Sequence, residues 1–133
     1  MQAALDGRRR DRKAAARAVP EGRFAWEGPV AWAAFDGEID GEFFPALLPG
    51  AGVIVTDSPH PDHPGRWIVK VRLGAAAPAG VSLGRLAITE TIDPAYGGRW
   101  NAGSCKRGGG SALDPVAFAA ALRGSFAPPT PAP

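Results

Sequence analysis

The chain has 133 residues, the length of one ordinary domain and too few for two. It contains one cysteine, so no intrachain disulfide can form and a disulfide-rich secreted scaffold is excluded. No stretch approaches the roughly 20 apolar residues of a membrane span, and no apolar signal-peptide core follows the basic N-terminal residues. We therefore expect an intracellular protein without a membrane partner, located in the cytoplasm or in a particle assembled inside the cell.

The net charge of +2 is unevenly distributed along the chain. Residues 1–23 contain seven Lys or Arg and three Asp or Glu, a balance of +4, so the remainder carries −2. The basic character is thus a property of an N-terminal arm, which is the expected contact for nucleic acid or for an acidic protein partner. The residues expected to make this contact are Arg8, Arg9, Arg10, Arg12, Lys13 and Arg17.

This arm, residues 1–20, has a helix-forming composition but no apolar stripe. Asp6 and Arg10 have the i,i+4 spacing that stabilises a helix, whereas nearly all apolar residues are alanine and Gly7 interrupts them. We expect a basic helical arm that is solvated, or disordered until a partner docks on it.

From residue 21 onward, short apolar runs separated by Gly, Pro, Asp and Ser predict strands joined by turns. The clearest strand is residues 66–73, in which Trp67, Val69, Val71 and Leu73 alternate with Arg66, Ile68, Lys70 and Arg72. Such alternation predicts one face in a core and one face toward water. Further strands are expected at residues 23–26, 30–35, 52–57 and 81–92. Their spacing of about ten residues favours a mainly β domain, residues 21–124, folded as a small antiparallel barrel or sandwich.

The C-terminal region predicts one short helix, residues 114–123, followed by an extended tail. Asp114 can cap this helix, Pro115 suits its first position and Gly124 can end it, while Leu113 and Phe118 have the spacing of a hydrophobic staple. Residues 125–133 are proline-rich and predict a polyproline segment that binds a partner. The prolines of this partner-binding tail are Pro128, Pro129 and Pro131.

The turn between the strands at 52–57 and 66–73 contains both histidines of the chain. Its sequence, SPHPDHPG, resembles the H-x-H-x-D-H-x-G-G motif of the metallo-β-lactamase superfamily, with His60, Asp62 and His63 at the later positions. The resemblance implies a zinc site, which Cys105 could complete if the chain brought it close. Ser58 stands in place of the first histidine, however, and three prolines favour a rigid turn. We prefer the turn and keep the metal site as the alternative.

An acidic segment approaches a second metal motif. Asp36, Glu38, Asp40 and Gly41 reproduce the opening of a calcium-binding loop. Leu47 stands where that loop needs its bidentate carboxylate, so a solvated turn is the preferred interpretation.

The lone thiol and the glycines after it are weak candidates for chemistry. Cys105 lies beside Lys106 and Arg107, whose charges would lower the pKa of the thiol, but no base is close in sequence. The glycine run lacks the G-K-[ST] ending of a phosphate-binding loop. We therefore predict no catalytic residue and no cofactor.

Three functions are consistent with these features. The preferred one is a non-enzymatic structural or adaptor subunit of a larger assembly, such as a virion-like particle or multisubunit complex, which docks on other proteins through its terminal arms. The second is a small nucleic-acid-binding protein that uses the basic arm and exposed members of the set Trp26, Trp32, Trp67 and Trp100, although tryptophans more often fill a core. The third is a metal-binding enzyme at the turn that holds His60 and His63.

Overall fold

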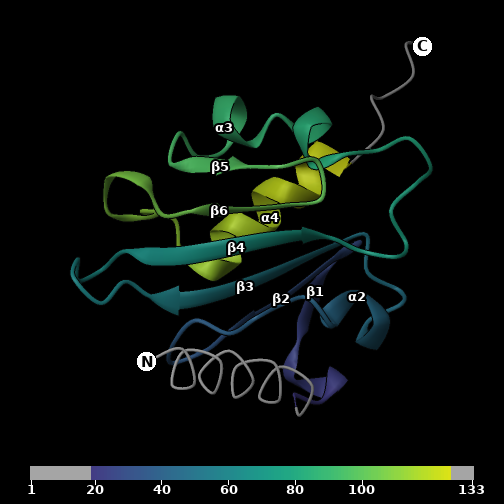
Figure 1. The fold of residues 1–133 in the computed structure, drawn as a ribbon, viewed down its shortest axis with the longest axis horizontal. Coiled ribbons are helices and arrows are strands. Elements are labelled where there is room, and N and C mark those ends of the chain that lie inside the picture. The colour runs from purple at the N-terminus through teal and green to yellow at the C-terminus, as the bar shows by residue number, and fades with distance from the viewer. Residues whose placement is uncertain (1–18, 127–133) are drawn as a thin grey trace, which may run out of the picture.

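A computed structural model of the protein describes residues 19–126, apart from the side chains of Glu21, Arg107 and Phe126. This part of the chain is built on a six-stranded sheet with the strand order β1-β2-β3-β4-β6-β5 (Figure 1). The strands are β1 (Ala25–Glu27), β2 (Val30–Ala34), β3 (Val53–Pro59), β4 (Trp67–Leu73), β5 (Tyr96–Gly98) and β6 (Ala102–Cys105). The helices are α2 (Phe44–Leu47), α3 (Ile88–Thr91) and α4 (Pro115–Phe126), with 3-10 turns η1 (Glu21–Arg23), η2 (Leu83–Leu86) and η3 (Arg107–Gly109). Within residues 19–126, no helix is both long and apolar enough to cross a bilayer.

The sheet is mixed and open. β2 and β3 run parallel, every other neighbouring pair is antiparallel, and β1 and β5 form the two edges. A mainly β domain with a short C-terminal helix is therefore confirmed. The finer prediction of a small antiparallel barrel or sandwich is corrected in one strand pair, because β2 and β3 are parallel, and closure into a barrel is not confirmed. The long connection at residues 35–52, which includes α2, returns the chain parallel to β2 instead of folding it back as a hairpin.

The predicted strands are confirmed except for one. β3 and β4 pair as an antiparallel hairpin from Val53↔Leu73 to Pro59↔Trp67, as the alternating pattern predicts. Residues 81–92 were expected to form a strand but fold into η2 and α3 instead. Their buried side chains, Leu83, Leu86 and Ile88, are spaced by three and two residues and so do not fit the two-residue period of a strand.

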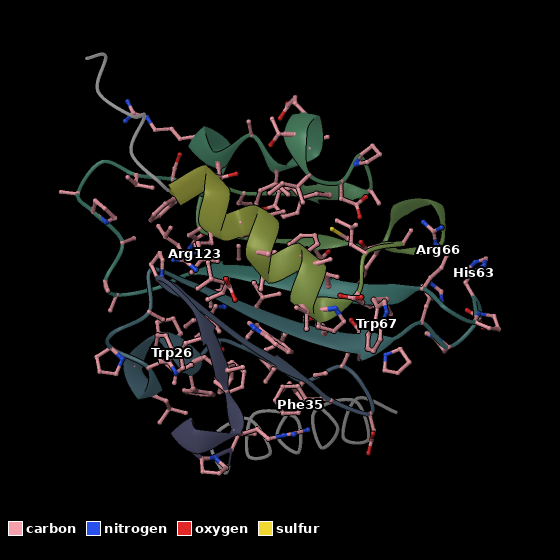
Figure 2. All side chains as sticks on the ribbon, turned by 180° about the vertical axis from the view of Figure 1, so that it is seen from behind. Trp26, Phe35, His63, Arg66, Trp67 and Arg123 are labelled. Atoms are coloured by element: carbon pink, nitrogen blue, oxygen red, sulfur yellow. The ribbon has the colours of Figure 1, made fainter. Side chains whose placement is uncertain are left out.

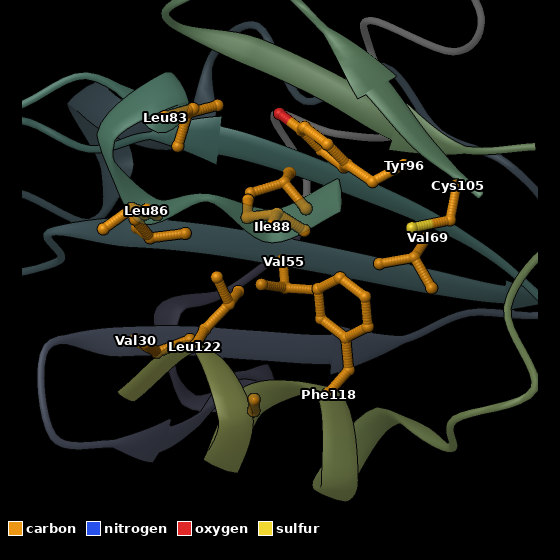
Figure 3. Packing of buried hydrophobic residues seen from close by; sticks show 13 residues of the cluster. Val30, Val55, Val69, Leu83, Leu86, Ile88, Tyr96, Cys105, Phe118 and Leu122 are labelled. Atoms are coloured by element: carbon orange, nitrogen blue, oxygen red, sulfur yellow. The ribbon is translucent and has the colours of Figure 1, made fainter. Parts of the chain in front are cut away.

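One face of the sheet packs against α4 and forms the larger core. Figure 3 shows Phe118 and Leu122 directed from α4 toward Val55 and Val69 of the strands. All four side chains are fully buried, and burial of a side chain of this size contributes about 1.5–3 kcal/mol to the free energy of unfolding. η2 and α3 close the side of this core beside β5.

Helix α4 begins as predicted and ends later than predicted. The backbone N–H of Ala117 donates to Asp114 Oδ1 at 2.8 Å, which confirms the N-terminal cap. The helix continues to Phe126, so Gly124 lies inside it and residues 125 and 126 belong to the helix instead of the tail. An exposed glycine costs about 1 kcal/mol within a helix, and the buried Leu122 on the same turn holds the helix to the sheet.

The terminal predictions lie outside the described residues. These are the basic arm with Arg8, Arg9, Arg10, Arg12, Lys13 and Arg17, and the tail with Pro128, Pro129 and Pro131. They remain predictions.

Residues 19–126 cover the opposite face of the sheet only in part. Phe24 and Phe44 meet edge to face with their ring centroids 5.1 Å apart, and they pack with Ile54 of β3 in a second, smaller core. The neighbouring surface of β4, β5 and β6 lines a pocket instead. This face of the sheet holds the candidate site.

Candidate anion-binding site on the open face of the sheet

The pocket has a volume of about 530 Å³ and is built on four adjacent strands. Strand pairing places its residues side by side across the sheet. Lys70 of β4 lies between Thr56 of β3 and Ser104 of β6, and Arg72 of β4 lies opposite Ala102 of β6. Because side chains alternate along a strand, Lys70 and Arg72 point away from the valines of the core. The wall consists of Gly41, Phe44, Ile54, Thr56, Lys70, Val71, Arg72, Gly97, Gly98, Arg99, Asn101, Ala102, Gly103, Ser104 and Lys106.

The pocket wall is strongly basic. Among the described residues, it contains four cations, Lys70, Arg72, Arg99 and Lys106, and no Asp or Glu. The hydroxyls of Thr56 and Ser104 and the amide of Asn101 add hydrogen-bond donors. Because residues 24–133 carry a net charge of −2, this positive surface reflects segregation of charge within the domain.

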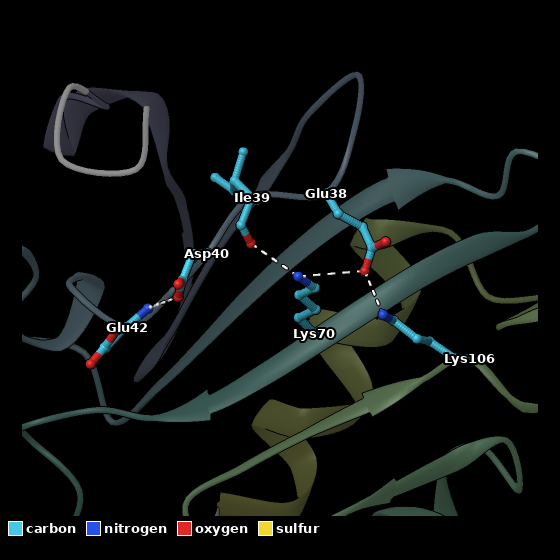
Figure 4. Close-up of polar contacts among 6 residues, drawn as sticks. All are labelled: Glu38, Ile39, Asp40, Glu42, Lys70 and Lys106. Carbon is cyan, nitrogen blue, oxygen red and sulfur yellow. Dashed lines mark hydrogen bonds and ion pairs between the residues drawn. The ribbon is translucent and has the colours of Figure 1, made fainter. Parts of the chain in front are cut away.

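A carboxylate of the protein itself lies against this wall. Oε1 of Glu38 forms ion pairs with Lys106 Nζ at 2.7 Å and with Lys70 Nζ at 3.4 Å (Figure 4). Lys70 Nζ also donates to the carbonyl oxygen of Ile39 at 3.1 Å. Burial of Glu38 alone would raise its pKa, but the hydrogen bond from Lys106 and the two ammonium charges outweigh burial, so the pKa of Glu38 is lowered. Two lysines therefore converge on one anionic group.

The acidic segment is not arranged as a calcium loop. Glu38 is engaged by lysines, and Asp40 Oδ1 accepts a hydrogen bond from the backbone N–H of Glu42 at 3.0 Å, which closes a local turn. Within residues 19–126, no three or more His, Cys, Asp or Glu side chains gather in a geometry that could hold a metal ion.

The histidines lie together at the tip of the β3–β4 hairpin. The His60 and His63 rings meet edge to face with their centroids 4.6 Å apart, and the N–H of Asp62 donates to His60 Nδ1 at 3.1 Å. Figure 2 shows His63 and Arg66 at this end of the molecule. The geometry agrees with the preferred turn; Cys105 does not join the histidines in a metal-binding group within the described residues.

The glycine run after β6 has a structural role at this turn. Gly108, Gly109 and Gly110 have φ angles of 59°, 87° and 84°, a left-handed conformation that glycine adopts without strain. Arg66 donates to the carbonyl oxygens of Gly109 and Gly110 at 3.0 and 2.7 Å, so the run is fastened to the hairpin. A side chain at Gly110 would collide with the backbone oxygen of Trp67.

The thiol of Cys105 is not activated, although the adjacent Lys106 and Arg107 predicted a lowered pKa. It is fully buried in the core, and burial, together with the nearby Asp93 and Asp57, raises the pKa of its thiol to about 12. The predicted lowering is wrong because consecutive side chains of an extended chain point to opposite faces. Cys105, the last residue of β6, projects into the core, and Lys106, which follows it, lines the pocket. At neutral pH this thiol is protonated and unsuited to nucleophilic attack.

Buried polar groups gather near the start of α4. The Ser111 hydroxyl donates to Asp93 Oδ2, and the N–H of Ala95 donates to Asp93 Oδ1 at 2.9 Å. Asp57, which is 1% exposed, has no hydrogen-bond partner for either carboxylate oxygen among the described residues. Burial and the negative charge of Asp114 raise the pKa of Asp57 to about 7.

The four tryptophans divide into two pairs. Trp32 and Trp67 are partly buried and pack against the larger core, as large aromatics usually do. Trp26 and Trp100 are 42% and 65% exposed, and Trp100 lies in the turn between β5 and β6, beside the pocket residues Arg99 and Asn101.

Sequence reasoning missed the pocket itself. The alternation in residues 66–73 already assigns Lys70 and Arg72 to a solvent-facing surface. It could not predict that β6 would pair with β4 and bring Ser104 and Lys106 beside them, because strand order is not encoded in local periodicity.

In comparisons with known proteins, no family model, no curated protein and no solved structure matches this chain. Its function is therefore inferred from the geometry and charges of the site.

Proposed function

We propose that this protein is a binding protein, not an enzyme, and that it holds an anionic ligand in the basic pocket on the open face of its sheet. The observation that carries this proposal is the convergence of Lys70 and Lys106 on the carboxylate of Glu38. The pair already binds an anionic group supplied by the protein, and no described Asp or Glu lines the pocket beside the other two cations, Arg72 and Arg99. Arg99 also lines a neighbouring cavity that contains Glu90. Arginine favours planar or tetrahedral oxyanions because its guanidinium presents several donors in a fixed geometry.

Binding is favoured over catalysis because no described Cys, His, Asp or Glu side chain lines the pocket to act as a general base for the hydroxyls of Thr56 and Ser104. The nearby carboxylate of Glu38 is already engaged by two lysines. The polar wall of the pocket consists of cations, two hydroxyls and an amide, whereas the thiol of Cys105 faces the opposite side of the sheet. Both histidines lie at the tip of the β3–β4 hairpin and do not line this pocket.

The adaptor role through terminal arms remains compatible with this proposal. A pocket that holds an anionic partner and arms that dock on neighbouring proteins could act together in one assembly. Participation of the arms stays a prediction, since residues 1–18 and 127–133 lie outside the described part of the chain.

The test compares two variants of the full chain that each lose three positive charges. The first carries Lys70→Gln, Arg72→Gln and Lys106→Gln in the pocket, and the second carries Arg8→Gln, Arg9→Gln and Arg10→Gln in the arm. Binding of inorganic polyphosphate is measured by calorimetry at about 50 mM and about 200 mM salt, because release of counterions makes polyanion binding salt-dependent. Circular dichroism checks that both variants fold.

We expect the pocket variant to lose affinity by about ten-fold or more at the lower salt concentration, and the arm variant to lose less. Wild-type affinity in the pocket variant would overturn the proposal. If the arm variant alone lost binding, the anion contact would belong to the arm.

A further inference from the structure

An exposed aromatic side chain extends the basic pocket. Trp100 is 65% exposed, yet the backbone of its turn is firmly held: the N–H of Arg99 donates to the carbonyl of Ala102 at 2.7 Å, and the N–H of Leu83 donates to the carbonyl of Trp100 at 2.7 Å. The N–H of Leu73 donates to the carbonyl of Asn101 at 2.9 Å, which ties the turn to β4. The indole is thus presented to solvent from a fixed backbone.

Hollows connect Trp100 with the cations. A cavity of about 290 Å³ is lined by Trp100 together with Arg72 and Asn101, and these last two residues also line the larger pocket. Another cavity, of about 460 Å³, is lined by Trp100 together with Arg99 and Glu90. The surface is therefore continuous from Lys106, across Arg72, to the indole.

The spacing of these groups suits an extended chain of anions. Lys70 and Arg72 are two residues apart on β4, a separation of about 6.7 Å, and β6 lies about 4.8 Å from β4. Neighbouring phosphates of an extended single strand have a comparable separation. The pocket wall beside the cations includes the small residues Gly97, Ala102 and Gly103.

We propose that the anionic ligand is single-stranded nucleic acid, whose phosphates lie along Lys70, Arg72, Arg99 and Lys106 and one of whose bases stacks on Trp100. This inference rests on the proposed anion-binding function. It favours a nucleic acid over an acidic peptide because the ligand must offer both a regularly spaced backbone charge and a flat π-face for the indole. A duplex is disfavoured because its bases are already stacked on one another.

The experiment measures binding of three polyanions to the full chain by fluorescence anisotropy. They are oligo(dT) of about twelve nucleotides, an abasic deoxyribose-phosphate strand of the same length, and polyglutamate of similar charge. Each is titrated into the wild type, Trp100→Ala and Trp26→Ala. Trp26 is the matched control, since it is also exposed but does not line any of the three cavities described above.

We expect oligo(dT) to bind about 5- to 150-fold more tightly than the abasic strand, the affinity equivalent of one stacked base. Trp100→Ala removes this difference and Trp26→Ala retains it. The logarithm of affinity should fall with the logarithm of salt concentration with a slope of about −3, as four phosphate contacts on a single strand predict.

Two results overturn the inference and separate it from the proposed function. Equal binding of all three polyanions, unaffected by Trp100→Ala, or a preference for polyglutamate, would exclude nucleic acid as the ligand while keeping the pocket as an anion site. No salt-dependent binding of any polyanion would overturn both.

Discussion

The two faces of the sheet are built from the same strands but differ in what covers them. β4 alternates between them: Val69 and Val71 point into the core beneath α4, whereas Lys70 and Arg72 point into the open pocket. On the first face, apolar side chains from helix and strands exclude water. On the second, cations and small polar groups remain accessible. The two-residue period of a strand thus separates the side chains that stabilise the fold from those that line the pocket.

The largest effect on stability is expected on the helix-covered face. Phe118→Ala removes a fully buried ring that packs between α4 and the strands, and such truncations cost about 3–5 kcal/mol. Lys70→Gln on the open face should cost less than about 1 kcal/mol, as is usual for partly exposed ion pairs. Urea denaturation of both variants measures the difference, and similar losses at the two positions would contradict the division between the faces.

A second effect concerns the pH dependence of folding. The pKa of Asp57 is raised from its ordinary value of 3.8 to about 7, so the folded state retains a proton at pH values where the unfolded state has lost it. The associated stability is fully present below pH 3.8 and is lost as the pH rises through about 7. Between about pH 4.5 and about pH 8, the free energy of unfolding should fall by about 3 kcal/mol.

Asp57→Asn should remove this decrease, because the amide does not titrate. Because the variant also buries a polar amide, the test compares how the free energy of unfolding changes with pH and not its absolute value. Asp62→Asn, at an exposed position of the hairpin tip, is the control and should retain the wild-type slope. An unchanged slope in Asp57→Asn would show that Asp57 is not the titrating group.

The smallest effect is expected from Glu38, which occupies the two lysines of the pocket. Glu38→Gln should change the free energy of unfolding by at most about 1 kcal/mol, yet raise affinity for polyphosphate a few-fold, because it removes a competing carboxylate. Glu27→Gln is the matched control. Glu27 forms an ion pair with Arg123 of α4 at 3.0 Å, and its side chain is 33% exposed, compared with 30% for Glu38. An equal gain in polyphosphate affinity in both variants would mean that the gain comes from the change in net charge and not from the position of Glu38.

Much of the fold could be predicted from local patterns, because those patterns state which side chains must be buried. Alternation in residues 66–73 predicts β4, and the Asp114-Pro115 signal predicts the start of α4. Residues 81–92 misled the prediction because their β-branched residues favour a strand, whereas tertiary packing of Leu83, Leu86 and Ile88 favours short helical turns.

The candidate site could not be predicted in the same way. Its cations come from β4, the β5–β6 turn and the residue after β6, and only the strand order brings them together. The motifs around His60 and Cys105 contain residue types that can bind metals or act as nucleophiles, but His60 lies in a turn and Cys105 is buried. The short motifs therefore predicted the position of the candidate site less well than the polar face of β4 did.

The most direct test of the central claim is a map of backbone amide shifts by NMR during titration of the full chain with inorganic polyphosphate at low salt. We predict that shifts concentrate in residues 54–56, 70–72 and 97–106, on the open face of the sheet, while residues 115–126 of α4 remain unchanged. Shifts confined to the N-terminal arm, or spread over α4, would contradict the assignment of binding to this face.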